Sequence, residues 1–143
     1  NNSLIKYSEL CNIQNWRRIL STHYVSPFTL DGLKWNTVEH YLNGVKFKKT
    51  NPEYYKSFSL NSNSKYNKDP MLAKREVTNN VKLCDEYYNH DISIYQAYSQ
   101  LFAEDKLFRR VLLLTKNAKI IHYLYRKPSK IMKELMEIRN NNR

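Results

Sequence analysis

The clearest structural signals in the chain lie in residues 26–47, which read Ser26-Pro27-Phe28-Thr29-Leu30-Asp31-Gly32-Leu33-Lys34-Trp35-Asn36-Thr37-Val38-Glu39-His40-Tyr41-Leu42-Asn43-Gly44-Val45-Lys46-Phe47. The Asp-Gly pair separates two short apolar runs, a pattern typical of a tight β-hairpin. Asn36 or Thr37 can cap a following helix, because either side chain can accept a hydrogen bond from its first N–H groups. From residue 38 onward the apolar side chains recur with helical spacing. We therefore predict a hairpin followed directly by a helix.

Two charged side chains, Glu39 and Lys46, lie seven positions apart on this predicted helix. Seven residues are almost two turns, so both side chains project from nearly the same face, with Asn43 between them. Their backbones are about 10 Å apart along the axis, at roughly 1.5 Å per residue, and Lys46 leans back toward Glu39. A small ligand could sit between the two tips. The alternative is a solvated stripe on an ordinary amphipathic helix.

Gly44 stands inside the same predicted helix. A glycine there costs about 1 kcal/mol relative to alanine. A close packing partner, or a ligand pressed against the backbone, would explain its presence.

The rest of the chain is predicted to be mostly helical. We expect one α+β domain over residues 1–143, mostly helical, with a small β-hairpin and short strands. The expected segments are a weak helix over 1–16, extended chain over 17–35, a helix from 52, a polar loop over 59–68, a helix from 70, a separate helix over 76–90, helices over 92–102 and 107–114, a short strand over 118–125 and a last helix from 128.

Composition limits the function classes. The chain has 143 residues, and Lys and Arg outnumber Asp and Glu by 24 to 13, a formal net charge of +11. Such a basic chain attracts anions, including nucleotides, phosphosugars and nucleic acid. With only two glycines it has no Walker loop and no dinucleotide fingerprint. Two cysteines and four scattered histidines indicate neither a disulfide framework nor a metal site.

The start of the chain, residues 1–6, shows no apolar signal-peptide region, and no apolar run reaches the roughly 18 residues of a membrane span. We therefore expect a cytoplasmic or otherwise intracellular protein with no membrane partner.

Residues 26–47 resemble the signature of the NADAR family, whose domains act on NAD- and ADP-ribose-type compounds and related N-glycosides. The family pattern is Ser-Pro-Phe, a short hairpin, then Trp-x-Thr-Val-Glu-His-Tyr-x-x-Ala-x-Lys-Phe. Asn43 replaces the usual Gln and Gly44 the usual Ala, while Thr22 and His23 stand where the family has Asn and Phe. The similarity runs from about residue 17 to 139. It includes Asp69-Pro70-Met71-Leu72-Ala73-Lys74-Arg75 and the later helices.

The resemblance implies hydrolysis of an N-glycosidic bond on a ribose, in an ADP-ribose-like or phosphoribosylamine compound or in an ADP-ribosylated nucleotide or nucleic acid. It implies Glu39 as general acid/base and Lys46 as nucleophile or sugar-positioning cation. We expect no cofactor, and the scattered Cys and His residues predict no metal site. The residues expected to contact or shape the substrate site are Trp35, Tyr41, Asn43, His40, Thr22 and Lys74.

One departure from the family concerns residues 121–128. Family members commonly carry a Glu and a Trp-Gly-x-Gly loop there, whereas this chain has His122 or Tyr123 near the Glu place and no glycine. A basic, Tyr-rich replacement favours a larger polyanionic substrate. It also leaves open a catalytically impaired module that binds nucleic acid or an ADP-ribosylated partner, and a structural subunit of a larger complex.

Overall fold

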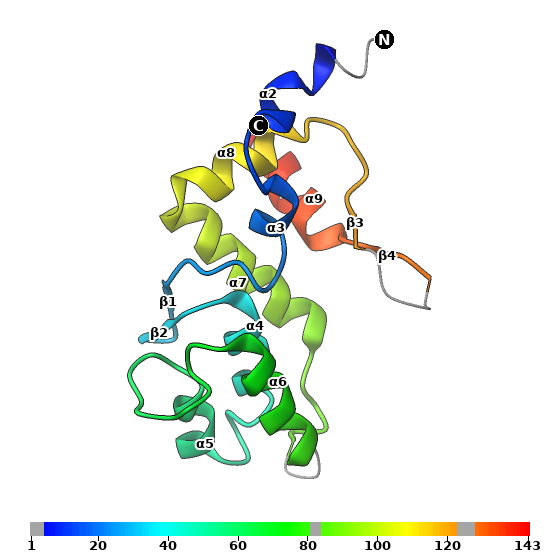
Figure 1. The fold of residues 1–143 in the computed structure, drawn as a ribbon. Coiled ribbons are helices and arrows are strands. Elements are labelled where there is room, and N and C mark those ends of the chain that lie inside the picture. The colour runs from blue at the N-terminus through cyan, green and yellow to red at the C-terminus, as the bar shows by residue number, and fades with distance from the viewer. Residues whose placement is uncertain (1–4, 81–83, 123–127) are drawn as a thin grey trace.

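The long helix α7 (His90–Glu104) runs through the middle of the molecule, with the other elements packed around it (Figure 1). A computed structural model describes residues 5–80, 84–122 and 128–143. In it, α7 contacts α4 (Val38–Val45), α8 (Lys106–Leu114), α9 (Lys133–Asn141) and strand β1 (Phe28–Leu30). The mostly helical α+β architecture predicted for a single domain is confirmed.

The predicted hairpin is present. Strands β1 and β2 (Leu33–Trp35) pair antiparallel, with Phe28 opposite Trp35 and Leu30 opposite Leu33. Asp31 and Gly32 form the turn with φ values of 58° and 74°. Two successive positive φ values characterise the type I′ turn that suits the twist of a two-residue hairpin. Trp35 closes the hairpin by donating its indole N–H to the Leu30 carbonyl at 3.0 Å.

Helix α4 begins where the sequence indicates, with Thr37 as its cap. The Thr37 hydroxyl accepts a hydrogen bond from the backbone N–H of His40 at 3.1 Å. The helix ends at Val45, so Lys46 is its C-terminal cap and lies at the edge of the helix rather than inside it. Gly44 lies directly against α5 (Pro52–Ser57) and the residue after it, because a Cβ there would stand 3.0 Å from the Cβ of Phe58. A close packing partner therefore explains this glycine.

The next two helices also begin at the predicted residues. Asn51 caps α5 and Asp69 caps α6 (Pro70–Asn79), each by accepting from backbone N–H groups of the first turn. Between them lies the predicted polar loop, which is tied together by hydrogen bonds from Asn67 and Ser62 to backbone carbonyls.

Three predicted segments differ from the structure. Residues 17–19, predicted as extended chain, belong to the short helix α3 (Trp16–Ile19) instead. The separate helix over 76–90 is wrong, because α6 ends at Asn79 and residues 84–89 are turns and bends. Helix α9 starts at Lys133, five residues later than predicted, because residues 130–131 pair as a strand instead.

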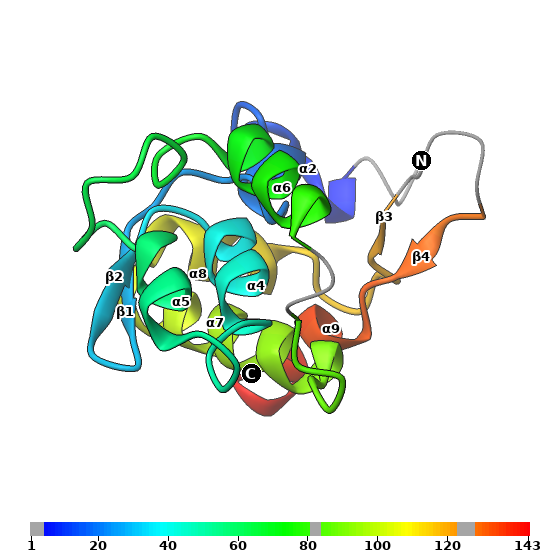
Figure 2. The same cartoon turned by 90° about the horizontal axis from the view of Figure 1, so that it is seen from below.

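The remaining elements surround the two chain ends. Within the predicted N-terminal helix, the described residues are helical at 5–6 and in the single turn α2 (Ser8–Cys11). Of the strand predicted over 118–125, the structure shows β3 (Ile121–His122), paired antiparallel with β4 (Lys130–Ile131), while residues 123–125 lie outside the described residues. The β3–β4 pair extends away from the helical body (Figures 1 and 2).

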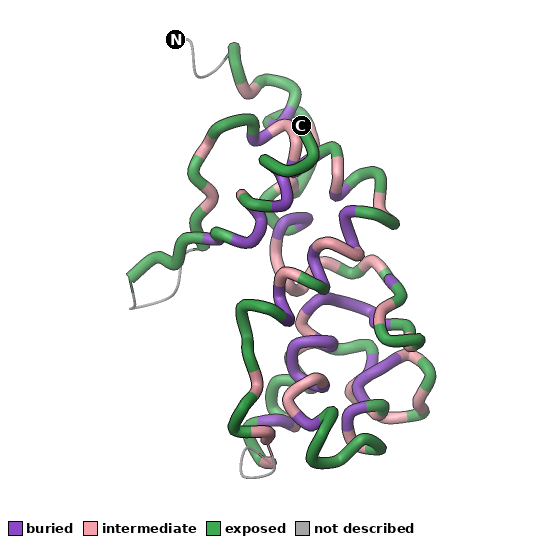
Figure 3. Tube along the Cα trace, turned by 180° about the vertical axis from the view of Figure 1, so that it is seen from behind, coloured by how far each residue is buried: buried purple, intermediate pink, exposed green. Residues whose placement is uncertain are grey.

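The core lies along the helices, where α4, α7, α8 and α9 bury their apolar sides (Figure 3). Trp35, Tyr98 and Phe108 are among its completely buried side chains. Among the helices of the described ranges, none combines the length and the apolar character that a bilayer crossing requires.

Candidate functional site

A cavity of about 910 Å³ opens between the first helices, α4, α7 and the segments on either side of the β3–β4 pair. Its apolar wall comes from residues of α2, α4, α7 and α9, including Leu10, Leu42, Ile94 and Leu135. Tyr98 forms part of this wall and donates its hydroxyl to the Leu20 carbonyl at 3.1 Å. Burial raises the pKa of Tyr98, so its hydroxyl is a neutral donor at physiological pH.

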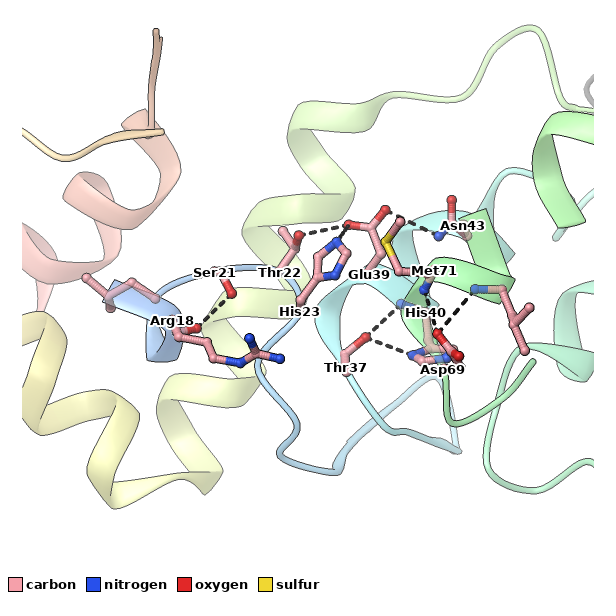
Figure 4. Close-up of polar contacts among 12 residues, drawn as sticks. Arg18, Ser21, Thr22, His23, Thr37, Glu39, His40, Asn43, Asp69 and Met71 are labelled. Atoms are coloured by element: carbon pink, nitrogen blue, oxygen red, sulfur yellow. Dashed lines mark hydrogen bonds and ion pairs between the residues drawn. The ribbon is translucent and has the colours of Figure 1, made fainter. Parts of the chain in front are cut away.

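Glu39 projects into this cavity from the first turn of α4, where the helix dipole favours a negative charge. Thr22 donates its hydroxyl to Glu39 Oε2 at 2.8 Å, and Asn43 donates its side-chain amide to Oε1 at 3.3 Å (Figure 4). The backbone N–H of Glu39 also donates to the Thr22 carbonyl at 2.9 Å. These bonds fix both oxygens of one carboxylate at the cavity wall.

His23 approaches the same carboxylate oxygen that Thr22 binds. Its Nε2 lies 3.8 Å from Glu39 Oε2, and its side chain is about one-third exposed (Figure 4). The sequence comparison noted His23 only as a replacement for Phe, so this contact with Glu39 is a feature that sequence reasoning missed.

Lys46 lines the same cavity as Glu39. Within the described ranges, the Lys46 ammonium forms no side-chain hydrogen bond and no ion pair. The Lys46 carbonyl accepts the Asp85 N–H at 2.7 Å, which anchors the end of α4. The structure thus brings Glu39, Asn43, Lys46 and Thr22 to one cavity.

The cavity is strongly basic. Glu39 is the only acidic side chain among the described residues that line it, whereas the basic ones are Arg17, Lys46, Lys119 and Lys130. His90 and His122 also line it. Burial lowers the pKa of His90, and the charges of Lys130 and Lys46 lower it further, so His90 is neutral at pH 7. The surplus of positive charge suits an anionic ligand.

Trp35 and Tyr41 do not line the cavity. Both are buried in the core, where their rings meet edge to face with centroids 5.2 Å apart, and Trp35 also packs against Tyr55 at 5.3 Å. They lie on the opposite side of α4 from the cavity. The expectation that they shape the pocket by direct contact does not fit this placement, because the cavity-lining positions of α4 are 39, 42, 43 and 46.

His40 and Lys74 also lie outside the lining. His40 is completely buried, with Nδ1 bonded to the Thr37 hydroxyl at 2.8 Å and Nε2 to the Tyr66 carbonyl at 2.8 Å. It therefore ties α4 to the polar loop. Lys74 is exposed on α6. The expected ligand contacts of these two residues do not fit the cavity.

Several cavity residues were not singled out from the sequence: Arg17, His90, Lys119 and Lys130. Arg17 belongs to α3, His90 to α7, Lys119 to the segment before β3 and Lys130 to β4, which are far apart along the chain. For Lys119 and Lys130, the available signal is the density of basic residues after position 115, which the sequence shows without indicating where they converge. His122, expected near a family Glu, does line the cavity, and Tyr123 lies outside the described residues.

A metal centre finds no support in the described ranges, which contain no group of three or more His, Cys, Asp or Glu side chains placed to hold an ion. The cavity offers one oriented carboxylate, the amines of Lys46, Lys119 and Lys130, and the Arg17 guanidinium.

The fold belongs to a known class of mostly helical α+β domains. The solution structure of the E. coli protein YbiA superposes with a TM-score of 0.61, covering 86% of this chain and 76% of that chain at 22% sequence identity. YbiA is the prototype of the NADAR family, so the fold that the resemblance implied is confirmed. No family model and no curated protein matches the chain.

Proposed function

We propose that this protein is an N-glycosidase that hydrolyses the N-glycosidic bond of an ADP-ribose-like or phosphoribosylamine compound. ADP-ribosylated nucleotides and nucleic acids are included among its substrates. The observation that carries the proposal is that Glu39 and Lys46 share one cavity whose other charged lining residues are basic. A ribose held there would have a carboxylate and an amine beside it and cations for its phosphates.

The Glu39 carboxylate stabilises the positive charge that develops at C1 as the glycosidic bond breaks. Thr22 and Asn43 hold its carboxylate in one orientation, so little reorganisation is needed during the reaction. As general acid/base, Glu39 transfers a proton to the departing base and later takes one from water.

Lys46 serves as the nucleophile. Its neutral amine attacks C1 while the electron pair of the glycosidic bond leaves with the base, which is protonated. Loss of the amine proton and opening of the ring give an imine between Lys46 and C1, with the ring oxygen becoming a hydroxyl. Water then adds to the imine carbon, and breaking of the C1–N bond releases the sugar and regenerates the amine. The absence of an ion pair on Lys46 within the described residues supports this role.

The test combines turnover with trapping. Wild type, Glu39→Gln, Lys46→Met and the control Lys34→Met are incubated with an ADP-ribosylated nucleotide, an ADP-ribosylated oligonucleotide and a phosphoribosylamine. Lys34 is an exposed lysine of β2 that does not line the cavity. We expect base release by wild type and Lys34→Met, and a loss of at least about 100-fold in the other two.

Borohydride would reduce the imine and leave the sugar on the protein, adding its mass in wild type and not in Lys46→Met. Full activity of both Glu39→Gln and Lys46→Met would overturn the proposal. Release without a trapped adduct would overturn only the nucleophilic role of Lys46.

A second candidate function is a binding module without turnover. The observation that favours it is the basic lining together with a net charge of +11. Such a module would bind an oligonucleotide with an affinity that falls steeply with salt, and would form no product from any ribosyl substrate.

A further inference from the structure

We propose that Tyr7, Trp16 and Arg17 form a second subsite of the cavity, which takes a nucleobase joined through a diphosphate to the ribose held beside Glu39 and Lys46. The proposal rests on the proposed function for the place of the ribose. It assigns a ligand-binding role to residues 7–17, most of which precede the region that resembles the family.

The size of the cavity is the first reason. Small-molecule sites range from about 300 to 1,000 Å³, and a volume of about 910 Å³ is close to the upper end. A single pentose phosphate beside Glu39 would leave most of this space unfilled. The lining continues away from Lys46 along α3 to Tyr7 and Cys11.

The second reason is the aromatic surface at that end. Trp16 and Tyr7 line the cavity and are only partly buried, whereas Tyr98 is completely buried in the wall. The Arg17 guanidinium lies 4.3 Å from the centre of the Trp16 ring, and the Lys116 ammonium lies 6.0 Å from that of Tyr7. Nucleobases stack on aromatic rings and on arginine planes, and each stacked base adds substantially to affinity.

The third reason is the distribution of charge. Glu39 is the only acidic residue of the described lining, and Arg17, Lys119 and Lys130 line the same cavity. None of these three cations forms an ion pair with a residue of the described ranges. Unpaired cations in the cavity that holds both the ribose site and the stacking site suit the phosphates of a diphosphate bridge.

Intrinsic fluorescence tests the subsite without requiring turnover. The chain has two tryptophans, and Trp35 is completely buried outside the cavity, so a ligand-dependent change reports Trp16. We expect saturable quenching by AMP and by ADP-ribose and none by ribose 5-phosphate. Trp16→Phe should abolish the signal while calorimetry still shows ADP-ribose binding, because an aromatic platform remains.

Affinity measurements with matched variants complete the test. Trp16→Ala should weaken ADP-ribose binding about 5- to 100-fold, the effect of losing one stacked base, and leave ribose 5-phosphate binding unchanged. Tyr87→Ala, which removes an 83% exposed ring outside the cavity, should change neither. Arg17→Met should weaken AMP and ADP-ribose binding and reduce its salt dependence, whereas Arg18→Met, at an exposed neighbour outside the lining, should not.

The subsite is overturned if ribose 5-phosphate binds as tightly as ADP-ribose, or if Trp16→Ala and Arg17→Met both leave ADP-ribose affinity unchanged. Either result stands whether or not the protein releases a base. Conversely, quenching of Trp16 fluorescence by AMP and ADP-ribose without base release from any substrate would contradict the proposed function but support the subsite.

Discussion

The two sides of helix α4 are built in opposite ways. The inner side carries Tyr41 and His40, which are buried and paired with core rings, the Thr37 hydroxyl and a loop carbonyl. The outer side carries Glu39, Asn43 and Lys46, which line the cavity. Along this one sequence motif, residues that support the fold therefore alternate with residues that line the cavity.

Residues of the inner side hold the helix in place, so their replacement should lower the free energy of unfolding. Residues of the outer side face space that a ligand can fill, so their replacement should change binding or turnover and leave stability nearly unchanged.

Trp35→Ala should have the largest effect on stability. The ring is completely buried against Tyr41 and Tyr55, and its indole N–H is bonded to Leu30. We expect a loss of about 3–5 kcal/mol in the free energy of unfolding, measured by urea denaturation. Trp16→Ala, at the partly buried cavity ring, is the control and should cost clearly less. Equal losses in the two variants would contradict the inference that Trp35 supports the fold while Trp16 faces the cavity.

Thr37→Ala should come next. The Thr37 hydroxyl accepts from the His40 backbone N–H and pairs with the His40 ring, so its removal leaves both groups buried without this partner. We expect a loss of about 2 kcal/mol. Thr37→Ser keeps the hydroxyl and should stay within about 1 kcal/mol of wild type. A serine variant as unstable as the alanine variant would show that the methyl group, and not the hydrogen bonds, is responsible.

Gly44→Ala should be destabilising although alanine favours helices. The new Cβ would lie 3.0 Å from Phe58 Cβ and 3.2 Å from the Tyr55 carbonyl oxygen. Overpacking costs about 1–3 kcal/mol and helix propensity returns about 1 kcal/mol, so we expect a net loss of about 1 kcal/mol in thermal or urea unfolding. A more stable variant would mean that the packing between α4 and α5 relaxes to accommodate the added methyl group at little cost.

His40 should make stability depend on pH. Burial lowers the pKa of His40 and outweighs the Tyr66 bond and the nearby Glu39 and Asp69 carboxylates, which raise it. The unfolded state then binds more protons as the pH falls through about 6.5, so acidification destabilises the fold. Between pH 6.5 and 5.5, one such histidine lowers the free energy of unfolding by at most about 1 kcal/mol.

The measurement is the urea midpoint at several pH values. His40→Gln should be less stable at every pH but should show a smaller pH slope than wild type. The pKa of His90 is also lowered, so His90 changes the free energy of unfolding with pH in the same direction. His90→Gln is therefore the reference variant, because it retains the pH dependence that His40 causes. An unchanged slope in His40→Gln would contradict the burial argument.

Lys46→Met should have almost no effect on stability. Among the described residues its ammonium has no ion pair or side-chain hydrogen bond to lose, and methionine keeps much of the side-chain volume. We expect a change within about 0.5 kcal/mol by urea denaturation, although ligand binding or turnover is lost. A loss of 2 kcal/mol or more would place Lys46 among the scaffold residues.

The two hairpins show how far the sequence predicts the fold. The β1–β2 hairpin was predicted because Asp31-Gly32 has the residue types that a turn with two positive φ values requires. The β3–β4 pair was predicted only in part, since no such turn signal marks it and both strands are exposed two-residue segments. Pro128 was interpreted as a helix start because local signals cannot show that Lys130–Ile131 finds a strand partner.

The candidate site was predictable to a similar degree. Helical spacing together with the family resemblance singled out Glu39, Asn43 and Lys46, and all three line the cavity. Trp35, Tyr41 and His40 belong to the same motif but face the core, because the motif fixes which residues are present and not which side of the helix faces the cavity. Arg17 and Lys119 reach the site through tertiary packing, which spacing along one segment does not encode.

Thr22 gives the two ends of the cavity a mechanical connection. It follows α3 closely, accepts the Glu39 main-chain N–H and donates its hydroxyl to the Glu39 carboxylate. In the proposed reaction, a ligand that presses on Trp16 would act through α3 and Thr22 on the group that orients the Glu39 carboxylate. Binding energy from the nucleobase could in this way help to orient the Glu39 carboxylate at the bond that breaks. Substrates without the nucleobase should then show a lower turnover number as well as a lower affinity.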